Sequence, residues 1–248
     1  FITSCDAEII PHAYEEYGLD FIKSVNGQFA IAMFDKKNNK LILIRDRLGI
    51  LPLYYYYDAK SDMFAFASEI KVLLQIPEYR KAINLEALNE YFTYRFIPGE
   101  DTIFRGIKRL KPGQILVFDK GIKISSYWEF AFQESNKTTA ENAELVRELL
   151  EDSVKIRLMS DVPLGAYLSG GLDSSAIVAF MAKHSDNVNT FNVSFSGTAQ
   201  DESKYAQLVA ETFSTNHKQI DIDVDAVNIL PMVAWHLDEP VADGATIP

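Results

Sequence analysis

From residue 27 to residue 127 the chain consists of short apolar runs separated by polar turns. Runs of this length, rich in aromatic and β-branched residues, predict β-strands. The predicted strands are residues 29–34, 41–44, 52–57, 63–67, 115–118 and 122–127. Lys36 to Asn39 and Asp119 to Gly121 are polar turns of hairpin size, so the pattern predicts antiparallel sheet. A helix over residues 7–17 precedes it, with Asp6 as a candidate N-cap and Gly18 as its end.

After residue 142 the pattern changes to alternating helices and strands. The predicted helices are residues 143–159, 174–183, 201–213 and 224–236, and the predicted strands are residues 162–168, 188–195 and 217–222. This alternation suits right-handed crossovers, which predict a parallel sheet with helices on both faces. The polar stretch 133–141 separates the two patterns. We therefore expect two domains, over residues 1–130 and 143–248, with a linker at residues 131–142.

Composition narrows the range of partners. Lys and Arg total 24 against 35 Asp and Glu, and the net charge of -11 disfavours nucleic acid as a partner. No apolar stretch is long enough for a membrane span, so we expect no membrane partner. A single cysteine cannot form an internal disulfide, and no signal peptide is visible. These features predict a cytoplasmic protein.

The strongest chemical signal is the segment Leu168 to Ser175, which reads Leu-Ser-Gly-Gly-Leu-Asp-Ser-Ser between a predicted strand and a predicted helix. Ligands converge on such a junction, because a helix N-terminus presents free backbone N–H groups. Gly170 and Gly171 allow a tight turn with no side chain between those groups and a phosphate. Ser174 and Ser175 add hydroxyl groups. The segment predicts a phosphate-binding loop.

The loop differs from two common nucleotide motifs. It has no Lys beside its serine pair, unlike a Walker A loop, and it lacks the third glycine of a dinucleotide fingerprint. Asp173 would repel phosphates unless a metal ion bridged them, so its presence indicates a Mg²⁺ nucleotide. The structural alternative is a plain glycine turn in which Asp173 caps the helix.

The full loop resembles the SGGxDS loop of N-type ATP pyrophosphatases, which cleave ATP between its α and β phosphates. The resemblance extends along nearly the whole chain to asparagine synthetases of the glutamine-hydrolysing, B type. The similar segments, in order, are VNGQFAIAMFD (residues 25–35), IRDRLGILPLYY (44–55), FASEIKVLL (66–74), YRFIPGEDTIFRGIKRLKPGQ (94–114), SDVPLGAYLSGGLDSS (160–175) and LDEPVADGATIP (237–248).

This resemblance implies a fold and an activity. The fold would be an α+β N-terminal nucleophile hydrolase domain of antiparallel sheets, followed by an α/β, Rossmann-like adenine nucleotide alpha hydrolase domain with a parallel sheet. The first domain would release ammonia from glutamine. The second would use ATP and Mg²⁺ to activate aspartate as β-aspartyl-AMP, which ammonia converts to asparagine. The protein would thus be a carbon–nitrogen ligase with glutamine as nitrogen donor.

The resemblance also assigns roles to residues. Asp6 matches the aspartate that holds the α-amino group of glutamine, although a helix N-cap is its structural alternative. Leu168 and Val193 match positions that contact adenosine, and Asp173 matches a Mg²⁺ ligand. The ATP-binding loop itself would be Ser169, Gly170, Gly171, Leu172, Asp173, Ser174 and Ser175.

The similar segment at residues 44–55 contains Arg45, Asp46, Arg47 and Gly49. We expect these residues to have structural roles, namely ion pairing and a turn, rather than direct catalytic ones.

We expect no catalytic nucleophile in this sequence. A glutaminase of this type needs Cys as the first residue of the mature chain, and the sequence begins with Phe1. Cys5 is predicted to be a small, partly buried thiol. The four histidines have no metal-ligand spacing. The HRGPD, NGE and SGDGGDE segments of the family do not occur either, so we expect an internal fragment of a longer enzyme.

Two other functions remain open. A paralogue with the same two domains would amidate another carboxylate, in polysaccharide or natural-product biosynthesis. A degenerate module would only bind or regulate. Its complete sequence would lack both the N-terminal cysteine and the second acidic loop, which is the SGDGGDE segment of the family. The expected small-molecule partners are glutamine, aspartate and ATP, and a homodimer is left open.

The missing nucleophile gives a first prediction. The 248-residue chain expressed alone should neither hydrolyse glutamine nor make asparagine. Assays for glutamate and asparagine check this, and measurable turnover of either kind would contradict it.

Overall fold

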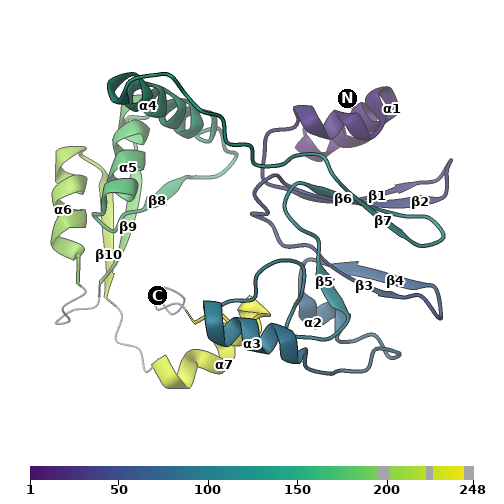
Figure 1. The fold of residues 1–248 in the computed structure, drawn as a ribbon. Helices are drawn as coiled ribbons and strands as arrows, with labels where there is room; N and C mark the ends of the chain where they lie inside the picture. The colour runs from purple at the N-terminus through teal and green to yellow at the C-terminus, as the bar shows by residue number, and fades with distance from the viewer. Residues whose placement is uncertain (195–200, 222–225, 243–248) are drawn as a thin grey trace. The chain divides into compact units, whose positions relative to one another are not determined.

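The computed structural model of the chain describes residues 1–194, 201–221 and 226–242 (Figure 1). It forms two compact units: unit 1 is Phe1–Phe132 with Leu230–Thr246, and unit 2 is Gln133–Ile229 with Ile247–Pro248. Three ends of predicted elements lie outside the described residues, namely Phe195, Ile222 and Val224. The same holds for the part beyond residue 242 of the segment 237–248, which resembles asparagine synthetases. In the described ranges no helix is long and apolar enough to cross a membrane.

Unit 1 contains two antiparallel sheets. The first has the strand order β1-β2-β6-β7, and the second has the order β4-β3-β5. The strands are β1 (Ala30–Asp35), β2 (Lys40–Arg45), β3 (Tyr54–Asp58), β4 (Met63–Ala67), β5 (Ile107–Arg109), β6 (Gln114–Phe118) and β7 (Ile122–Ser126). The prediction of antiparallel sheet is confirmed, and both predicted hairpin turns are present. Among the described strands of unit 1, the sequence pattern missed the three-residue strand β5.

Strand β2 explains how unit 1 is layered, because both of its faces are buried. Ile42 and Ile44 pack with Phe21 and Ile22, beneath helix α1 (Ile9–Tyr17) and the 3-10 segment η2 (Gly18–Ser24). Leu43 faces the other way, into a cluster that includes Tyr55 of the second sheet. The first cluster joins α1 to the first sheet, and the second cluster joins the first sheet to the second sheet. Figure 1 shows this order from α1 to β3 and β4.

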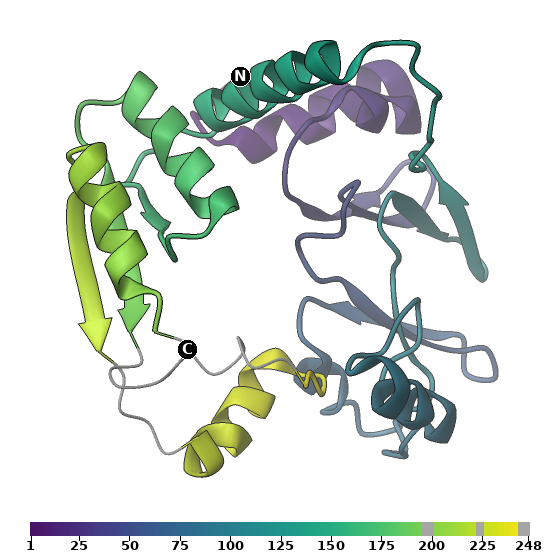
Figure 2. The same ribbon diagram turned by 60° about the vertical axis from the view of Figure 1, so that its left-hand side comes forward.

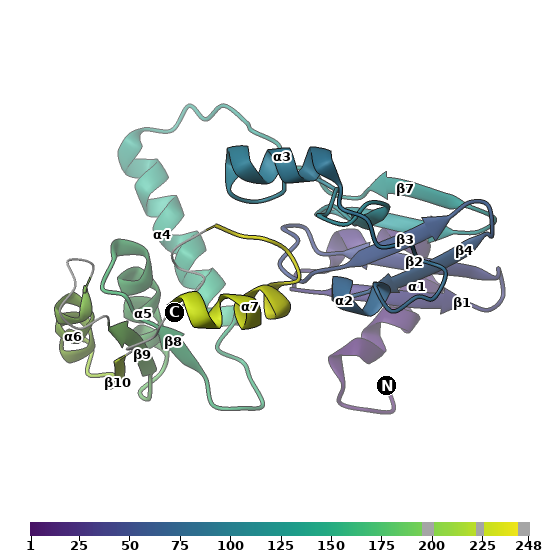
Figure 3. The same ribbon diagram turned by 90° about the horizontal axis from the view of Figure 1, so that it is seen from below.

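The outer face of the second sheet is closed by a short helix, α2 (Ile70–Leu73). Its Ile70 and Leu73 are buried with Tyr54 and Ile107 of the sheet. The longer helix α3 (Leu85–Tyr94) was not predicted from the pattern, although its first residues carry a clear signal. The Asn84 side chain accepts hydrogen bonds from two amides of the first turn, as an N-cap does. The helices of unit 1 are seen from another direction in Figure 3.

The predicted cap of the first helix is wrong. Asp6 is itself the first residue of a 3-10 turn, η1 (Asp6–Glu8), and its side chain caps no amide. Glu8 takes the organising role, because its Oε2 accepts hydrogen bonds from the amide of Thr3 at 2.7 Å and from the Thr3 hydroxyl at 2.6 Å. The Thr3 bonds, together with a hydrogen bond from the Ile2 amide to Glu8 Oε1, lower the pKa of Glu8 to about 2. The predicted end is confirmed, since Gly18 has φ +58 directly after α1.

Unit 2 contains a parallel sheet with the order β10-β9-β8. Its elements are α4 (Thr139–Ile156), β8 (Gly165–Tyr167), α5 (Leu172–His184), β9 (Asn189–Ser194), α6 (Ser203–Thr212) and β10 (Asn216–Asp221), and helix α7 (Ala226–Leu237) follows them along the chain. The predicted parallel sheet is therefore confirmed. Figure 2 shows β9 and β10 running beside α6. Helices α5 and α6 share one buried cluster with Leu168. That helices also cover the other face of the parallel sheet stays a prediction.

Helix α4 begins four residues earlier than predicted, inside the expected linker. Thr138 and Glu141 form a reciprocal capping box: the Glu141 amide donates to Thr138 Oγ1, and the Thr138 amide donates to Glu141 Oε2 at 2.7 Å. The polar residues at the end of the expected linker therefore form the start of a helix. Strand β8 is also shorter than the predicted run of residues 162–168.

Candidate phosphate-binding site

The loop from Ser169 to Ser175 lies where β8 ends and α5 begins, as the sequence predicts. Leu168 anchors its start. The Leu168 amide donates to Phe191 O at 2.7 Å, its carbonyl accepts from the Asn192 side chain at 2.9 Å, and the residue is buried. Strand β9 therefore fixes the position from which the loop departs.

Gly170 turns the loop in a conformation that other residues rarely adopt, with φ +84. A Cβ atom at this position would lie 2.5 Å from Tyr205 Cβ and 2.6 Å from the amide nitrogen of Ala206. Both atoms belong to the first turn of α6. The loop backbone therefore passes directly against α6, and only glycine fits.

The N-terminus of α5 is open toward an anion. Gly171 is its N-cap, and no side chain caps the amides of the first turn. The first helical hydrogen bond is from Ser175 N to Gly171 O, so the amides of residues 172–174 have no helical partner. Ser169 Oγ and Ser174 Oγ lie 3.0 Å apart beside them. Free amides, hydroxyl groups and the positive end of the helix dipole together suit a phosphate.

Asp173 is exposed in the first turn of α5. Its carboxylate is a suitable oxygen ligand for Mg²⁺, although across the described ranges no three His, Cys, Asp or Glu side chains are grouped to hold a metal. A metal ion here would take its other ligands from phosphate oxygens and water, which is the usual arrangement for Mg²⁺ with nucleotides. The residues present therefore fit a metal that arrives with its nucleotide.

Val193 lies near the end of β9, half-buried, next to Ser194. The carboxyl ends of parallel strands meet at one edge of a sheet, so Leu168 and Val193 are brought to the edge that carries the loop. Asn192 is a supporting residue that the sequence analysis missed. Its signal was a polar residue at an inward position of the strand, where Thr190 and Ser194 are also buried.

Asp6 belongs to unit 1, whereas the loop belongs to unit 2, and Asp6 is exposed. Its side chain accepts a weak hydrogen bond, in which Cys5 Sγ donates to Asp6 Oδ1 at 3.7 Å. The carboxylate is therefore accessible to a cationic group. The prediction of a partly buried Cys5 is wrong, since this thiol is exposed.

The turn after β2 is built from charged side chains that bind backbone groups. Asp46 is buried and accepts hydrogen bonds from the amides of residues 48, 50 and 51. Arg45 donates to the carbonyls of Leu51, Leu110 and Gly49. Gly49 has φ +67, so the predicted turn is confirmed. The predicted ion pairing is wrong: in the part of the chain that the structure describes, neither Arg45 nor Arg47 has a carboxylate within 4.0 Å.

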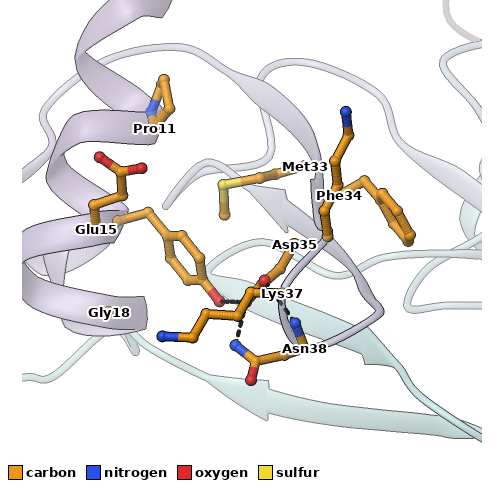
Figure 4. Close-up of a pocket in the computed structure, with 10 residues that line it drawn as sticks. Pro11, Glu15, Gly18, Met33, Phe34, Asp35, Lys37 and Asn38 are labelled. Carbon is orange, nitrogen blue, oxygen red and sulfur yellow. Dashed lines mark hydrogen bonds between the residues drawn. The ribbon is translucent and has the colours of Figure 1, made fainter.

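A second concave region lies between α1 and the β1–β2 hairpin, with a volume of about 680 Å³ (Figure 4). Asp35 is its central charge. Tyr14 donates its hydroxyl to Asp35 Oδ2 at 2.8 Å, and Asn38 donates its side chain at 2.7 Å and its amide at 3.0 Å. The Asn38 bonds, with Tyr14, lower the pKa of Asp35 to about 2. Burial and the Asp35 partner raise the pKa of Tyr14 to about 12. Asp35 Oδ1 binds within the hairpin, and Oδ2 also links the hairpin to α1 through Tyr14, so the role of Asp35 is structural.

Comparison with known proteins identifies two regions. A family described as "Glutamine amidotransferase domain" matches residues 1–128, and one described as "Asparagine synthase" matches residues 145–248. The chain belongs to the glutamine amidotransferase domain family and carries a region similar to asparagine synthases behind that domain.

Several curated relatives cover almost the whole chain. A putative asparagine synthetase (glutamine-hydrolyzing) 2 from Methanocaldococcus jannaschii is 37% identical over 99% of this chain and 49% of that protein. Asparagine synthetase (glutamine-hydrolyzing) 1 from Bacillus subtilis is 32% identical over 100% of this chain and 39% of that protein. An amidase, chry2, from Gibberella zeae is 29% identical over 98% of this chain. The chain spans about half, or less, of the length of these relatives.

The two loop glycines give a matched prediction. Gly170→Ala should destabilise unit 2 by more than about 2 kcal/mol, because it adds left-handed strain to overpacking against α6. Gly171→Ala should cost less than about 1 kcal/mol, since its φ is -67 and its added Cβ would meet only the Ser169 hydroxyl at 3.3 Å. Denaturant unfolding of both variants measures the difference, and equal losses would contradict the close approach to α6.

The Asp35 network predicts a pH dependence. Because the pKa of Asp35 is lowered in the folded chain, its ionised form contributes stability above the ordinary carboxyl pKa. That contribution is lost as pH falls through about 2. Asp35→Asn should therefore reduce the loss of unfolding free energy between about pH 5 and about pH 2.5, measured by denaturant titration at each pH. Asp20→Asn, at an exposed position of unit 1, should keep the wild-type slope. Identical slopes for Asp35→Asn and wild type would contradict the role of the network.

Proposed function

We propose that this chain is part of a glutamine-dependent asparagine synthetase, a ligase that transfers the amide nitrogen of glutamine to aspartate at the expense of ATP. The observation that carries the proposal is the open phosphate loop at the start of α5, in a chain that also belongs to the glutamine amidotransferase domain family. The names of the relatives from M. jannaschii and B. subtilis support the same activity.

The loop supports a specific use of ATP. The amides of residues 172–174 and the hydroxyls of Ser169 and Ser174 would bind the β and γ phosphates, which leave together as pyrophosphate. The loop segment carries no Lys or Arg, so the phosphate charge needs another counter-ion. Mg²⁺, held by Asp173, would supply that charge and make pyrophosphate a better leaving group.

The proposed reaction has two steps. A β-carboxylate oxygen of aspartate attacks the α phosphorus of ATP, and the bond to the bridging oxygen of pyrophosphate breaks. Ammonia then attacks the carbonyl carbon of β-aspartyl-AMP, AMP leaves and a proton is released. The other products are asparagine and the glutamate that glutamine hydrolysis leaves. By holding the pyrophosphate part of ATP, the loop residues would act in the first step.

The remaining assigned residues would position the substrates. Leu168 and Val193, at the same sheet edge as the loop, would contact the adenosine part of ATP. Asp6 would pair with the α-ammonium group of glutamine, which its exposed carboxylate allows. Leu172 and Ser175 complete the loop as residues of the first turn of α5.

The proposal includes the finer fold and the domain boundaries. Unit 1, with two antiparallel sheets and a helix outside each, supports an N-terminal nucleophile hydrolase fold. Unit 2 supports a Rossmann-like adenine nucleotide alpha hydrolase fold. We propose that these domains correspond to residues 1–130 and 143–248, joined at 131–142, in a cytoplasmic enzyme whose assembly as a homodimer is untested.

A second candidate is an amidotransferase that acts on another carboxylate. The similarity to an amidase from G. zeae supports this second candidate. Both candidates share the phosphate loop and the adenylation step, and they differ in the acceptor. A degenerate binding module, the third candidate, would perform neither step.

The acceptor is tested in the complete protein. Incubation with Mg-ATP, glutamine and aspartate should produce asparagine, AMP and pyrophosphate in equal amounts. Pyrophosphate release that depends on a different carboxylate, without asparagine, would favour the second candidate and overturn the first. Absence of both glutamine hydrolysis and pyrophosphate release would favour the binding module.

The metal role of Asp173 is tested by one substitution. Asp173→Asn in the complete protein should lower Mg²⁺-dependent pyrophosphate release by about 100-fold or more, because a metal ligand is lost. Glutamine hydrolysis should persist, since the substitution lies outside unit 1. Asp186→Asn, at an exposed position after α5, is the matched control and should change neither rate. Equal loss of both activities in Asp173→Asn would indicate misfolding and contradict a ligand role.

A further inference from the structure

Residues 235–242, here called the anchor segment, belong to different regions by sequence and by contacts. They lie in the region that matches asparagine synthase, residues 145–248. Their contacts, however, group them with unit 1, the unit that matches the glutamine amidotransferase domain. A stretch similar to one enzyme region is thus built into the fold of the other.

Asp238 makes the first attachment. It has φ +62, and its carboxylate accepts hydrogen bonds from the amides of Ile70 at 2.8 Å and Lys71 at 3.4 Å, at the start of α2. Lys71 Nζ lies 3.1 Å from Asp238 Oδ1 and 5.4 Å from the ring centroid of Trp235. The Asp238 side chain is only 7% exposed. A residue far along the chain therefore caps this helix.

Glu239 makes the second attachment, to β5. Its carboxylate forms an ion pair with Arg109 Nη2 and accepts a hydrogen bond from the Tyr54 hydroxyl at 3.3 Å. Arg109 is held in place from the other side, because its Nη1 donates to the carbonyls of Ile97 and Gly99. Side-chain exposure is 17% for Arg109 and 11% for Glu239. This is a largely buried ion pair with a fixed geometry.

A backbone hydrogen bond makes the third attachment. Ala242 donates its amide to the carbonyl of Arg95 at 2.8 Å, directly after α3, where Arg95 has φ +68. The anchor segment is therefore held at α2, at β5 and after α3. Three separate elements of unit 1 fix its path.

Stability alone does not explain this choice of residues. A buried ion pair is often no more stabilising than apolar side chains of similar size, and its best-attested use is to specify one arrangement. Glu239 Oε1 is moreover buried and, among the described residues, has no hydrogen-bond partner, which costs free energy. Positioning explains both features.

We propose that the anchor segment positions the asparagine synthase region relative to the glutamine amidotransferase unit, through the Arg109–Glu239 pair, so that ammonia released from glutamine is used for amide synthesis. This rests on the proposed function. Ammonia that escapes into water is protonated and lost to the reaction, so a coupled enzyme needs its two regions held in register. Arg109 and Glu239 are positioning residues, because neither is assigned to a substrate.

The test is a charge exchange in the complete protein. Arg109→Glu and Glu239→Arg should each raise the ratio of glutamate to asparagine formed from glutamine by about fivefold or more, a typical size for lost coupling. Asparagine synthesis from added ammonia should stay near the wild-type rate. The double variant, with the charges exchanged, should bring the ratio part of the way back toward the wild-type value, because it re-forms the ion pair without the Arg109 hydrogen bonds to the carbonyls of Ile97 and Gly99. Arg105→Glu, an exposed charge reversal nearby, is the control and should leave the ratio unchanged.

A second readout does not depend on the reaction. In each single variant, amide hydrogen exchange at Ile70 and Lys71 should become about tenfold faster, because Asp238 is released with the segment. The double variant should exchange more slowly at these amides than either single variant. Faster exchange with an unchanged product ratio, unchanged exchange, or a double variant no better than the single variants in both measurements would each overturn the proposal. A protein that makes no asparagine even from ammonia would instead contradict the proposed function, and exchange would then report on the anchor segment alone.

Discussion

The backbone of Gly170 lies against the first turn of α6 with no room for a Cβ atom. This close approach determines the path of the phosphate loop. Leu168 is tied to β9 on one side, and Gly171 begins α5 on the other, so the chain must reverse within three residues. The free amides of α5 and the hydroxyls of Ser169 and Ser174 take their positions from that reversal. Every chemical role assigned to the loop depends on it.

Charged side chains in unit 1 serve geometry in the same way. Asp46 accepts hydrogen bonds from three backbone amides, and Arg45 donates hydrogen bonds to three backbone carbonyls. Charged side chains therefore hold the turn after β2 through its backbone. Asp35 holds a hairpin to a helix, and Asp238 caps α2. Charge-assisted hydrogen bonds to backbone groups are stronger than neutral ones, which suits segments that have no regular structure of their own.

Local signals were sufficient for much of the fold and for the loop. Short apolar runs rich in aromatic and β-branched residues predicted β1 to β4, β6 and β7, because that composition between polar turns is typical of strands. The pair Gly170 and Gly171 predicted the turn into α5, since glycine pairs have few other uses at such a junction.

Features that depend on distant contacts were not predictable in this way. The inward position of Asn192 signals that its side chain needs a partner, but nothing near it identifies the Leu168 carbonyl, and nothing near Glu239 identifies Arg109. The prediction of Asp6 as the cap failed for another reason: two acidic residues, Asp6 and Glu8, lie at that helix start, and the three-dimensional path of residues 2–3 selects Glu8. The start of α4 was a local signal, the Thr138 and Glu141 capping box, hidden in a stretch that otherwise has the composition of a linker.

Binding of the phosphates of a Mg²⁺ nucleotide by the loop should be visible in amide hydrogen exchange of the complete protein, measured with and without Mg-ATP. We expect slower exchange at residues 170–174 with Mg-ATP and with magnesium pyrophosphate, and little change there with AMP, which lacks the phosphates that the loop would hold. Exchange at these residues that does not change with Mg-ATP, or that slows equally with AMP, would contradict such binding.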